Sequence, residues 1–363
     1  MNIINDDINH FKEILKNKIN KKYMKVGKVN INKIEETITG GRKYQKKRNR
    51  TKEINIGFQL DPGYVLRTMI TVASIMDSQK KDTEIRLHFI VVLGFNVENM
   101  LKIYSLRDKI RDDVEFNFYN GNKVEKDFYG IHPKGPGAVA KILLPHLLPN
   151  DIERLIVFDT GDLLVLRDLS EMYNWILGNY LYVGAPDPRI GANATISKKP
   201  FEVYINIGHF LLNVKKIKSQ KMYDKYIKFI NKYKNQIKNI YYKNIFDQDL
   251  LNDVAQKSIG YLPIKFGLFS PFVNDAESDN PNVANQYEIW NMTEEKLNNT
   301  FSYLPKNSKE YFRLSYNPVV IHQWNGKWQN GEGISIYRRL CQYYIRYAGI
   351  WNELCEKFPG YCQ

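Results

Sequence analysis

Cysteine is scarce in this sequence. The 363 residues include only three, Cys341, Cys355 and Cys362, all near the C-terminal end. An odd number of cysteines gathered at one end does not form a disulfide framework, which excludes a small fold stabilised mainly by disulfides. The cysteine count therefore predicts a protein of a reducing compartment.

Long apolar runs and a leader pattern are missing as well. No segment approaches the roughly 20 consecutive apolar residues that cross a bilayer, which excludes a membrane-spanning helix. The first 15 residues lack the basic start and apolar core of a secretory signal. Together with the cysteine count, these absences predict a soluble, cytoplasmic protein.

Two common nucleotide-binding fingerprints are absent. Neither GxGxxG nor GxxxxGK[ST] follows the first predicted strand, which excludes the usual dinucleotide fold and the P-loop. The composition itself is ordinary, with 43% apolar and 25% charged residues, so it excludes wholesale disorder. A chain of this length can form one large α/β domain or two smaller ones.

The net charge of +14 is distributed unevenly. Residues 1–53 contain 15 basic and 6 acidic side chains, a net charge of +9, which leaves +5 for the other 310 residues. We interpret residues 1–53 as a basic N-terminal extension. Its run at 40–52 could attract nucleic acid, an anionic membrane or an acidic substrate, or it could be a solvated tail.

From Ile54 onward, short apolar strands alternate with helical patterns. The expected strands are 54–61, 85–94, 114–120 and the start of the apolar run 154–165, and the expected helices are 64–79, 96–110 and 138–148, the last broken at Pro145. Strands that are apolar throughout and alternate with helices indicate an α/β fold, with a parallel sheet covered on both faces. Ligands of such sheets bind beyond the carboxyl ends of the strands.

Two carboxylates interrupt an apolar run. In RLIVFDTGDLLVLRDL, Asp159 and Asp162 stand where the pattern favours Val or Leu. A buried ionised carboxylate is costly unless it is paired or bound to a metal. The stretch is therefore either a turn or a metal site.

Five further motifs accompany this stretch in a fixed order. They are FQLDPGYV from Phe58, AVAKILLPHLLP around Lys141, INIGHFLLNVKK with Asn206 and Gly208, FDQDLLN with Asp247 and Gln248, and VVIHQWNGKW with His322, Gly326 and Lys327. Over roughly residues 54–330 the set resembles glycosyltransferase family 8. The resemblance implies a GT-A fold, which is a Rossmann-like mixed sheet with helices on both faces, and a retaining transfer of a hexose or pentose from a UDP-sugar.

The resemblance also implies roles for these residues. Those implied to bind the donor are Asp61, Tyr64, Lys141 (where the family usually has Arg), Asn206, Gly208, Gly326 and Lys327. Asp247 and Gln248 would lie beside the anomeric carbon as the catalytic pair. Asp159, Asp162 and His322 would bind a divalent metal. A histidine among the ligands favours Mn²⁺, and Mg²⁺ is the second choice.

The aspartate motif departs from the family pattern. Family members carry Asp-x-Asp, whereas this chain reads Asp-x-x-Asp with Gly161 inside. Glycine tolerates a positive φ, so the extra residue could bulge out and let Asp159 and Asp162 share one cation. Alternatively, Thr160 takes the first position. Asp162 is a candidate ligand in both registers.

Several assignments have an ordinary structural alternative. Asp61 precedes Pro62-Gly63, a turn composition. The alternatives for the others are a core histidine for His322, a strand bulge for Asn206 and Gly208, and a helix N-cap for Asp247.

The sequence as a whole predicts a catalytic domain at 54–333 and a C-terminal helix at 334–363 that packs on it. The partners are a UDP-sugar donor and an unidentified acceptor. Two other functions stay open: a nucleotide-sugar-binding GT-A protein with weak catalysis, and a binder of anionic partners through the basic extension.

Overall fold

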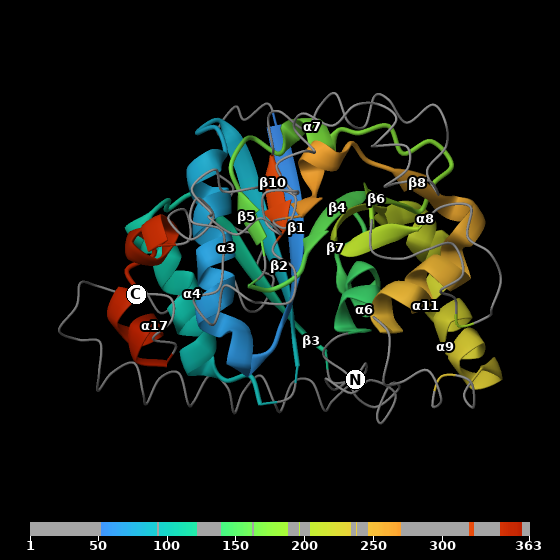
Figure 1. Cartoon of the computed structure of the whole chain (residues 1–363), viewed down its shortest axis with the longest axis horizontal. Coiled ribbons are helices and arrows are strands. Elements are labelled where there is room, and N and C mark those ends of the chain that lie inside the picture. Colours follow the sequence, from blue (N-terminus) through green and yellow to red (C-terminus); the bar gives the residue numbers. More distant parts are fainter. Residues whose placement is uncertain are drawn as a thin grey trace, which may run out of the picture.

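The computed structural model of the chain describes a central sheet with helices on both sides (Figure 1). The described residues are 52–92, 94–121, 139–161, 163–187, 196, 204–233, 237, 246–269, 319–322 and 342–357. The predicted site residues Asp162, Gly326 and Lys327, and the basic run at 40–51, lie outside them.

Seven strands form the main sheet, in the order β3-β2-β1-β4-β7-β6-β8. Their bounds are Lys52–Leu60 (β1), Thr83–Val91 (β2), Glu115–Asn120 (β3), Arg154–Phe158 (β4), Tyr182–Pro186 (β6), Ile205–Asn213 (β7) and Ile259–Tyr261 (β8). Strand β7 runs antiparallel to both β4 and β6, and the other pairs are parallel. The mixed sheet that the family resemblance implies is therefore confirmed, whereas the parallel sheet that the strand pattern predicts is wrong at β7.

Both faces of the sheet are buried because successive strand residues point to opposite sides. In β4, Ile156 and Phe158 join one apolar cluster, while Leu155 and Val157 join the other. The first cluster includes residues of helices α3 (Val65–Ser78), α4 (Val97–Lys109) and α17 (Trp351–Lys357). The second includes residues of α6 (Ala140–Leu147), α8 (Val214–Ser219), α9 (Met222–Lys232) and α11 (Phe246–Ala255).

Short elements complete the fold. They are the helix α7 (Ser170–Tyr173), the 3₁₀ turns η1 (Pro62–Tyr64), η3 (Gln256–Ser258) and η4 (Ile264–Phe266), and a small sheet of β5 (Leu163–Val165), β10 (Val320–His322) and β9 (Leu268–Phe269). In this small sheet, His322 pairs with Leu163 across an antiparallel ladder.

Helix α6 continues through Pro145, so the expected break is wrong. Proline cannot donate a hydrogen bond to the carbonyl four residues earlier, which is that of Lys141. The helix nevertheless buries both residues, and it packs against β1 and β2.

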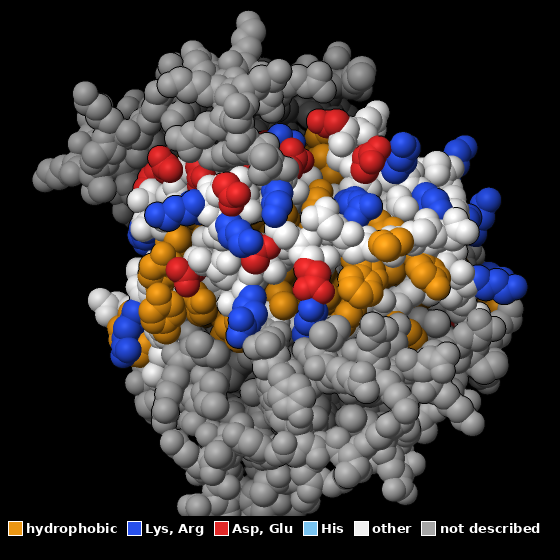
Figure 2. Space-filling model, turned by 90° about the horizontal axis from the view of Figure 1, so that it is seen from above, with side chains coloured by type: hydrophobic (Ala, Val, Ile, Leu, Met, Phe, Trp, Pro, Cys, Tyr) orange, Lys and Arg blue, Asp and Glu red, His pale blue; other side chains and the backbone are white. Residues whose placement is uncertain are grey.

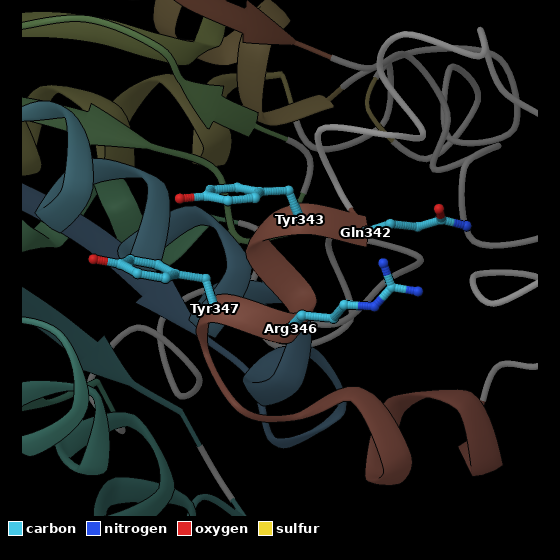
Figure 3. Close-up of a pocket in the computed structure, with 4 residues that line it drawn as sticks. All are labelled: Gln342, Tyr343, Arg346 and Tyr347. Carbon is cyan, nitrogen blue, oxygen red and sulfur yellow. The ribbon is translucent and has the colours of Figure 1, made fainter.

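The C-terminal region is helical, as predicted. Residues 342–347 form a helical segment in which the rings of Tyr343 and Tyr347 lie nearly parallel, with their centroids 5.7 Å apart (Figure 3). These two tyrosines, Gln342 and Arg346 line an open cavity of about 340 Å³. On the other side of this segment, Tyr344 and Ile345 are buried in the cluster that contains α3 and α4.

Cys355, in α17, is disulfide-bonded, a bond that the cysteine count did not predict. The other two cysteines lie outside the described residues. Within the described ranges, every helix is too short or too polar to cross a bilayer.

Basic and acidic side chains are interspersed on the face of the molecule seen from above (Figure 2). Some charged side chains of the described residues form ion pairs. Arg86 on β2, for example, lies within 3.4 Å of carboxylate oxygens of Glu53, Glu84 and Glu115 on β1, β2 and β3. The large excess of positive charge belongs instead to residues 1–53.

Candidate active site

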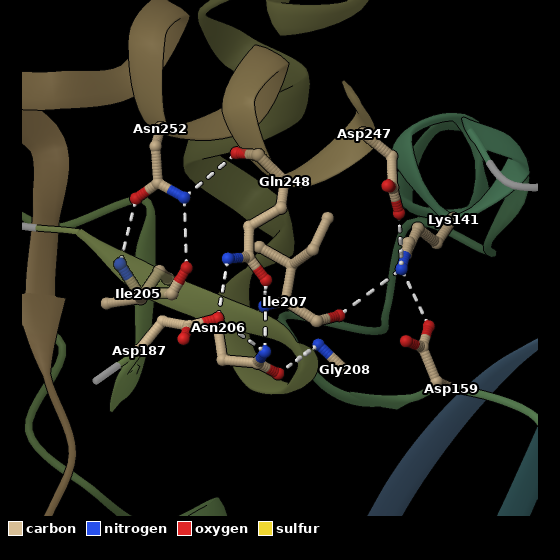
Figure 4. A network of polar contacts seen from close by, with 10 residues as sticks. All are labelled: Lys141, Asp159, Asp187, Ile205, Asn206, Ile207, Gly208, Asp247, Gln248 and Asn252. Atoms are coloured by element: carbon tan, nitrogen blue, oxygen red, sulfur yellow. Dashed lines mark hydrogen bonds and ion pairs between the residues drawn. The ribbon is translucent and has the colours of Figure 1, made fainter. Parts of the chain in front are cut away.

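Lys141 lies between Asp159 and Asp247 in the candidate site (Figure 4). Its ammonium nitrogen lies 2.6 Å from Oδ1 of Asp159, just beyond β4, and 2.9 Å from Oδ2 of Asp247, in the first turn of α11. The lysine side chain is only 2% exposed. Burial alone would lower the pKa of Lys141, but the two carboxylates outweigh it and raise the pKa above its ordinary value. Lys141 is therefore a fixed positive charge.

A second cluster of polar side chains lies beside this triad, built on Asn206, Gln248 and Asp187 (Figure 4). The Asn206 amide nitrogen donates to Asp187 Oδ2 and to Gln248 Oε1, both at 3.0 Å. Gln248 Nε2 donates to the same oxygen of Asp187 at 2.7 Å. All three side chains are at most 2% exposed. Their polar atoms satisfy one another, which is what makes such burial tolerable.

The backbone of β7 joins the two clusters. Gly208 N donates to Asn206 Oδ1 at 2.8 Å, and Gly208 O accepts from Asp159 N at 2.7 Å. Asn206 and Gly208 lie in an irregular stretch: Gly184 pairs with Phe210, but the next pair is Pro186 with Ile205. Four residues of β7 thus face one residue of β6. The bulge directs the Asn206 side chain toward Gln248 and Asp187.

Tyr204 and Asp249 form a buried pair next to this bulge. The Tyr204 hydroxyl donates to Asp249 Oδ1 at 2.6 Å. Burial raises the pKa of Asp249 to about 7, against the lowering effect of the Tyr204 hydrogen bond and with the help of the nearby carboxylates of Asp247, Asp253 and Asp187. The protonation of Asp249 thus changes near neutral pH.

Asp61 and Tyr64 lie at the end of β1, where the sequence predicts the base and ribose of the donor. The Asp61 side chain accepts a hydrogen bond from Gly63 N at 2.9 Å and caps η1, as the ordinary turn interpretation expects. The guanidinium of Arg67 lies over the Tyr64 ring, 5.1 Å from its centroid. Arg67, in the first turn of α3, is itself buried.

Arg67 also contacts the aspartate stretch. Gly161 has a φ of +83°, and a Cβ built on it would lie 2.5 Å from the Cβ of Arg67. The positive φ expected at Gly161 is therefore present, and the close approach of Arg67 gives a second reason for glycine there. Thr160, by contrast, is buried at 7% exposure.

The predicted metal ligands come from two segments that the small sheet joins. Asp159 directly follows β4, and Asp162 lies outside the described residues. Leu163, the residue after Asp162, pairs with His322. In the described part of the chain, no three His, Cys, Asp or Glu side chains gather as a metal-binding group. The backbone pairing nevertheless brings a histidine to the start of β5, and two carboxylates with one imidazole are a suitable donor set for Mn²⁺.

The sequence did not single out Asp187, Asp249, Tyr204 or Arg67. For Asp187 a signal existed: it directly follows the apolar strand β6, as Asp61 follows β1. Asp249 was visible as the next carboxylate in FDQDLLN. Tyr204 and Arg67 carried no such signal, because their roles depend on packing between distant segments.

Comparisons with known proteins bear on the family and the fold of the chain. The profile of glycosyl transferase family 8 matches residues 55–327. A provisionally named glycosyltransferase of Haemophilus influenzae is 30% identical over 140 residues, which are 38% of this chain and 40% of that protein. The match thus spans less than half the length of that relative.

Two solved structures share the fold. The galactosyltransferase LgtC, in complex with donor and acceptor sugar analogues, superposes with a TM-score of 0.60 at 18% identity, covering 82% of this chain and 95% of LgtC. The bifunctional glycosyltransferase WbbM gives a TM-score of 0.56 at 15% identity, covering 83% of this chain and 50% of WbbM. At these identities the likeness concerns the fold alone, and it confirms the predicted one.

Proposed function

The chain belongs to glycosyltransferase family 8, and from that premise we propose that it transfers a hexose or pentose from a UDP-sugar to an acceptor with retention of anomeric configuration. The observation that carries the proposal is the buried arrangement of Lys141, Asp159 and Asp247 beside Asn206, Gln248 and Asp187. It brings together distant segments that match the family motifs, and it satisfies each buried group in a fixed orientation. Fixed charges and dipoles are what electrostatic catalysis requires.

In this proposal Asp159, Asp162 and His322 hold a divalent metal, preferably Mn²⁺ and otherwise Mg²⁺. Such an ion supplies Lewis-acid stabilisation of the charge that grows on a diphosphate leaving group. Lys141 keeps Asp159 and Asp247 ionised and in place, and Lys327 adds positive charge next to the phosphates. Asp61 and Tyr64 bind the uracil and ribose, and Gly208 and Gly326 leave room for the donor.

Gln248 acts through its position rather than as a nucleophile. Its Oε1 already accepts hydrogen bonds from Asn206 Nδ2 at 3.0 Å and from Ile207 N at 3.2 Å. An amide oxygen engaged twice is a poor attacking group. We propose that the Gln248 amide orients the sugar, while the carboxylates of Asp187 and Asp247 stabilise the positive charge that develops at the anomeric carbon.

The acceptor is a glycan, a protein or a small molecule, and the basic extension at 1–53 could attract one that is acidic. A cytoplasmic location stays a prediction.

The test has two steps. The first measures thermal stability with UDP, with and without Mn²⁺, using ADP as the control nucleotide; a ligand that binds the folded state raises the melting temperature by mass action. The second measures hydrolysis across a panel of UDP-sugars. We expect a metal-dependent shift with UDP and turnover of one donor. A shift without turnover would favour the binding protein, and no shift with UDP would contradict the proposal.

A further inference from the structure

Asn252 lies on α11, one helical turn after Gln248, and it is completely buried. Its side chain makes three hydrogen bonds of 2.9 Å (Figure 4). Oδ1 accepts from the backbone N–H of Ile205, and Nδ2 donates to the carbonyls of Ile205 and Gln248. Both amide hydrogens are used, so the side chain is held in one orientation.

These bonds fall at the point where β7 loses its regular neighbour. Ile205 is the last residue paired with β6 before the bulge, and Asn206 follows it directly. Asn252 bonds both backbone groups of Ile205, and Gln248 Oε1 accepts from the N–H of Ile207, two residues on. Alternate residues of a strand offer their backbone groups to the same side. The side-chain amides of Asn252 and Gln248, both on α11, thus bond backbone groups of β7 that a neighbouring strand would otherwise pair.

We propose that Asn252 is a positioning residue for Gln248. Asn252 bonds both the carbonyl of Gln248 and the backbone of Ile205. It thereby fixes α11 along its axis at the position where the Gln248 amide reaches Ile207 and Asn206. The inference rests on the proposed function in one respect: the positioned amide has to act on the sugar. A second pair, Tyr204 and Asp249, anchors the same helix turn from the residue just before β7.

Few side chains can replace Asn252. Aspartate has almost the same shape and keeps an acceptor for Ile205 N, but it has no hydrogens to donate and would turn a carboxylate toward two carbonyls. Serine has one donor and reaches less far. Glutamine is one methylene longer and would displace the helix in a packed interior.

The test compares Asn252→Asp with Tyr226→Phe. Tyr226, on α9, is also fully buried, and its hydroxyl donates to that of Tyr182 at 3.0 Å. The control therefore removes a buried hydrogen bond without touching Gln248. We expect kcat for donor hydrolysis to fall at least about tenfold in Asn252→Asp, with UDP affinity within about twofold of wild type. A kcat no lower than that of Tyr226→Phe would overturn the proposal.

A double variant separates positioning from general damage. If Asn252 acts through Gln248, adding Asn252→Asp to Gln248→Ala should lower kcat by less than about twofold further. If the double variant instead loses kcat by the full product of the two single reductions, Asn252 acts independently of Gln248 and is merely structural. Asn252→Ser, whose hydroxyl retains one hydrogen-bond donor, serves in the same comparison if Asn252→Asp does not fold.

A crystal structure of the Asn252 variant decides the point without any turnover. The expected change is loss of the 3.2 Å contact between Gln248 Oε1 and Ile207 N and of the 3.0 Å contact with Asn206. An unmoved Gln248 amide would overturn the proposal. If wild-type protein hydrolyses no UDP-sugar, the proposed function fails, and the crystal structure still tests the role of Asn252.

Discussion

Oδ1 of Asp159 accepts a hydrogen bond from the Lys141 ammonium at 2.6 Å. The two residues come from the end of β4 and the first turn of α6, and the same ammonium reaches Asp247 on α11 at 2.9 Å. One buried cation thus links the carboxylate proposed to bind metal to the carboxylate proposed to lie beside the sugar. A substitution of Lys141, Asp159 or Asp247 should therefore alter the charge balance and the position of the other two side chains.

Lys141→Met should therefore destabilise the fold. Methionine fills a similar volume but leaves two carboxylates facing each other with little solvent. Breaking a buried ion pair by removing one partner costs roughly 3 to 5 kcal/mol, and we expect about 3 because Asp159 is 29% exposed. Urea unfolding measures this loss.

The matched control for Lys141→Met is Lys215→Met. Lys215 pairs with Glu153 at 3.2 Å, and both side chains are more than 60% exposed. Such a pair contributes less than about 1 kcal/mol. Equal losses in the two variants would mean that the Lys141 pairs contribute no more than a surface contact.

Gly161→Ala should lower the stability of the fold for two reasons, and the same substitution at Gly178 separates them. At φ +83° any side chain is strained, and at this site the new Cβ would also lie 2.5 Å from the Cβ of Arg67. Gly178 has a φ of +50° and nothing within 4 Å of an added Cβ. We expect Gly178→Ala to cost about 1 kcal/mol and Gly161→Ala at least about twice that. Similar melting temperatures would argue against the clash with Arg67.

Much of the fold could be predicted because its signals are local. Apolar strands such as β2 and the helical spacing in α3 are visible in short windows, and the positive φ at Gly161 followed from one extra residue in a known motif. The break at Pro145 was wrong for a different reason: burial of the α6 face outweighs one missing backbone hydrogen bond.

The site could be predicted only in part. The family motifs single out Lys141, Asp247 and Gln248, but the contacts among them depend on how α6, β4 and α11 pack. Asp187 and Tyr204 belong to the site through side-chain hydrogen bonds to residues of distant segments. The spacing of residues in the sequence does not encode such contacts. The disulfide of Cys355 likewise depends on distances that a cysteine count does not contain.

Asp249 should make the stability of the protein fall as pH rises. Burial raises its pKa from the ordinary 3.8 to about 7, so the folded state holds the proton more tightly than the unfolded state. The stabilisation is complete below pH 4 and is lost as pH rises through 7. The difference in pKa corresponds to at most about 4 kcal/mol.

Asp249→Asn removes this titration and keeps an acceptor for the Tyr204 hydroxyl. Relative to the variant, wild-type protein should therefore lose free energy of unfolding between pH 5 and pH 8. Urea unfolding of both proteins at the two pH values measures the change. A constant difference between them would contradict a raised pKa at Asp249.

His88 should make the stability of the protein fall as pH decreases, which is opposite to the effect of Asp249. Burial, and then the charge of Arg86, lower its pKa from 6.5 to about 3. The neutral ring is satisfied as it stands, with Nε2 2.9 Å from Asn55 Oδ1 and Nδ1 3.0 Å from the Tyr119 hydroxyl. Stability is thus present above pH 6.5 and lost as pH falls toward 3.

His88→Gln should remove this loss. Between pH 7 and pH 5 we expect the variant to gain about 2 kcal/mol relative to wild type in urea unfolding. Asp249 titrates with the opposite sign over much of this range, so wild-type protein alone would show a shallow dependence. The two single variants separate the contributions, and a variant that follows wild type at both pH values would refute the assignment to His88.

The register of the Asp-x-x-Asp motif predicts which variants lose manganese. Asp159 has a side chain that is 29% exposed, whereas Thr160 is only 7% exposed, so the carboxylate is the more accessible ligand as well as the charged one. In titrations with Mn²⁺ in the presence of UDP, Asp159→Asn and Asp162→Asn should each lower the affinity at least about tenfold. Thr160→Val should change it by less than about twofold.

The ion pair with Lys141 requires one more variant, because Asp159→Asn also leaves that ammonium less neutralised. Its positive charge alone could repel a cation. Asp247→Asn removes the other partner of Lys141 and leaves Asp159 intact, so it reproduces the repulsion without removing a metal ligand. If Asp159 binds the metal, Asp247→Asn should keep most of the Mn²⁺ affinity that Asp159→Asn loses. Equal losses would assign the effect to Lys141, and a silent Asp159→Asn together with a weakened Thr160→Val would move the first ligand to Thr160.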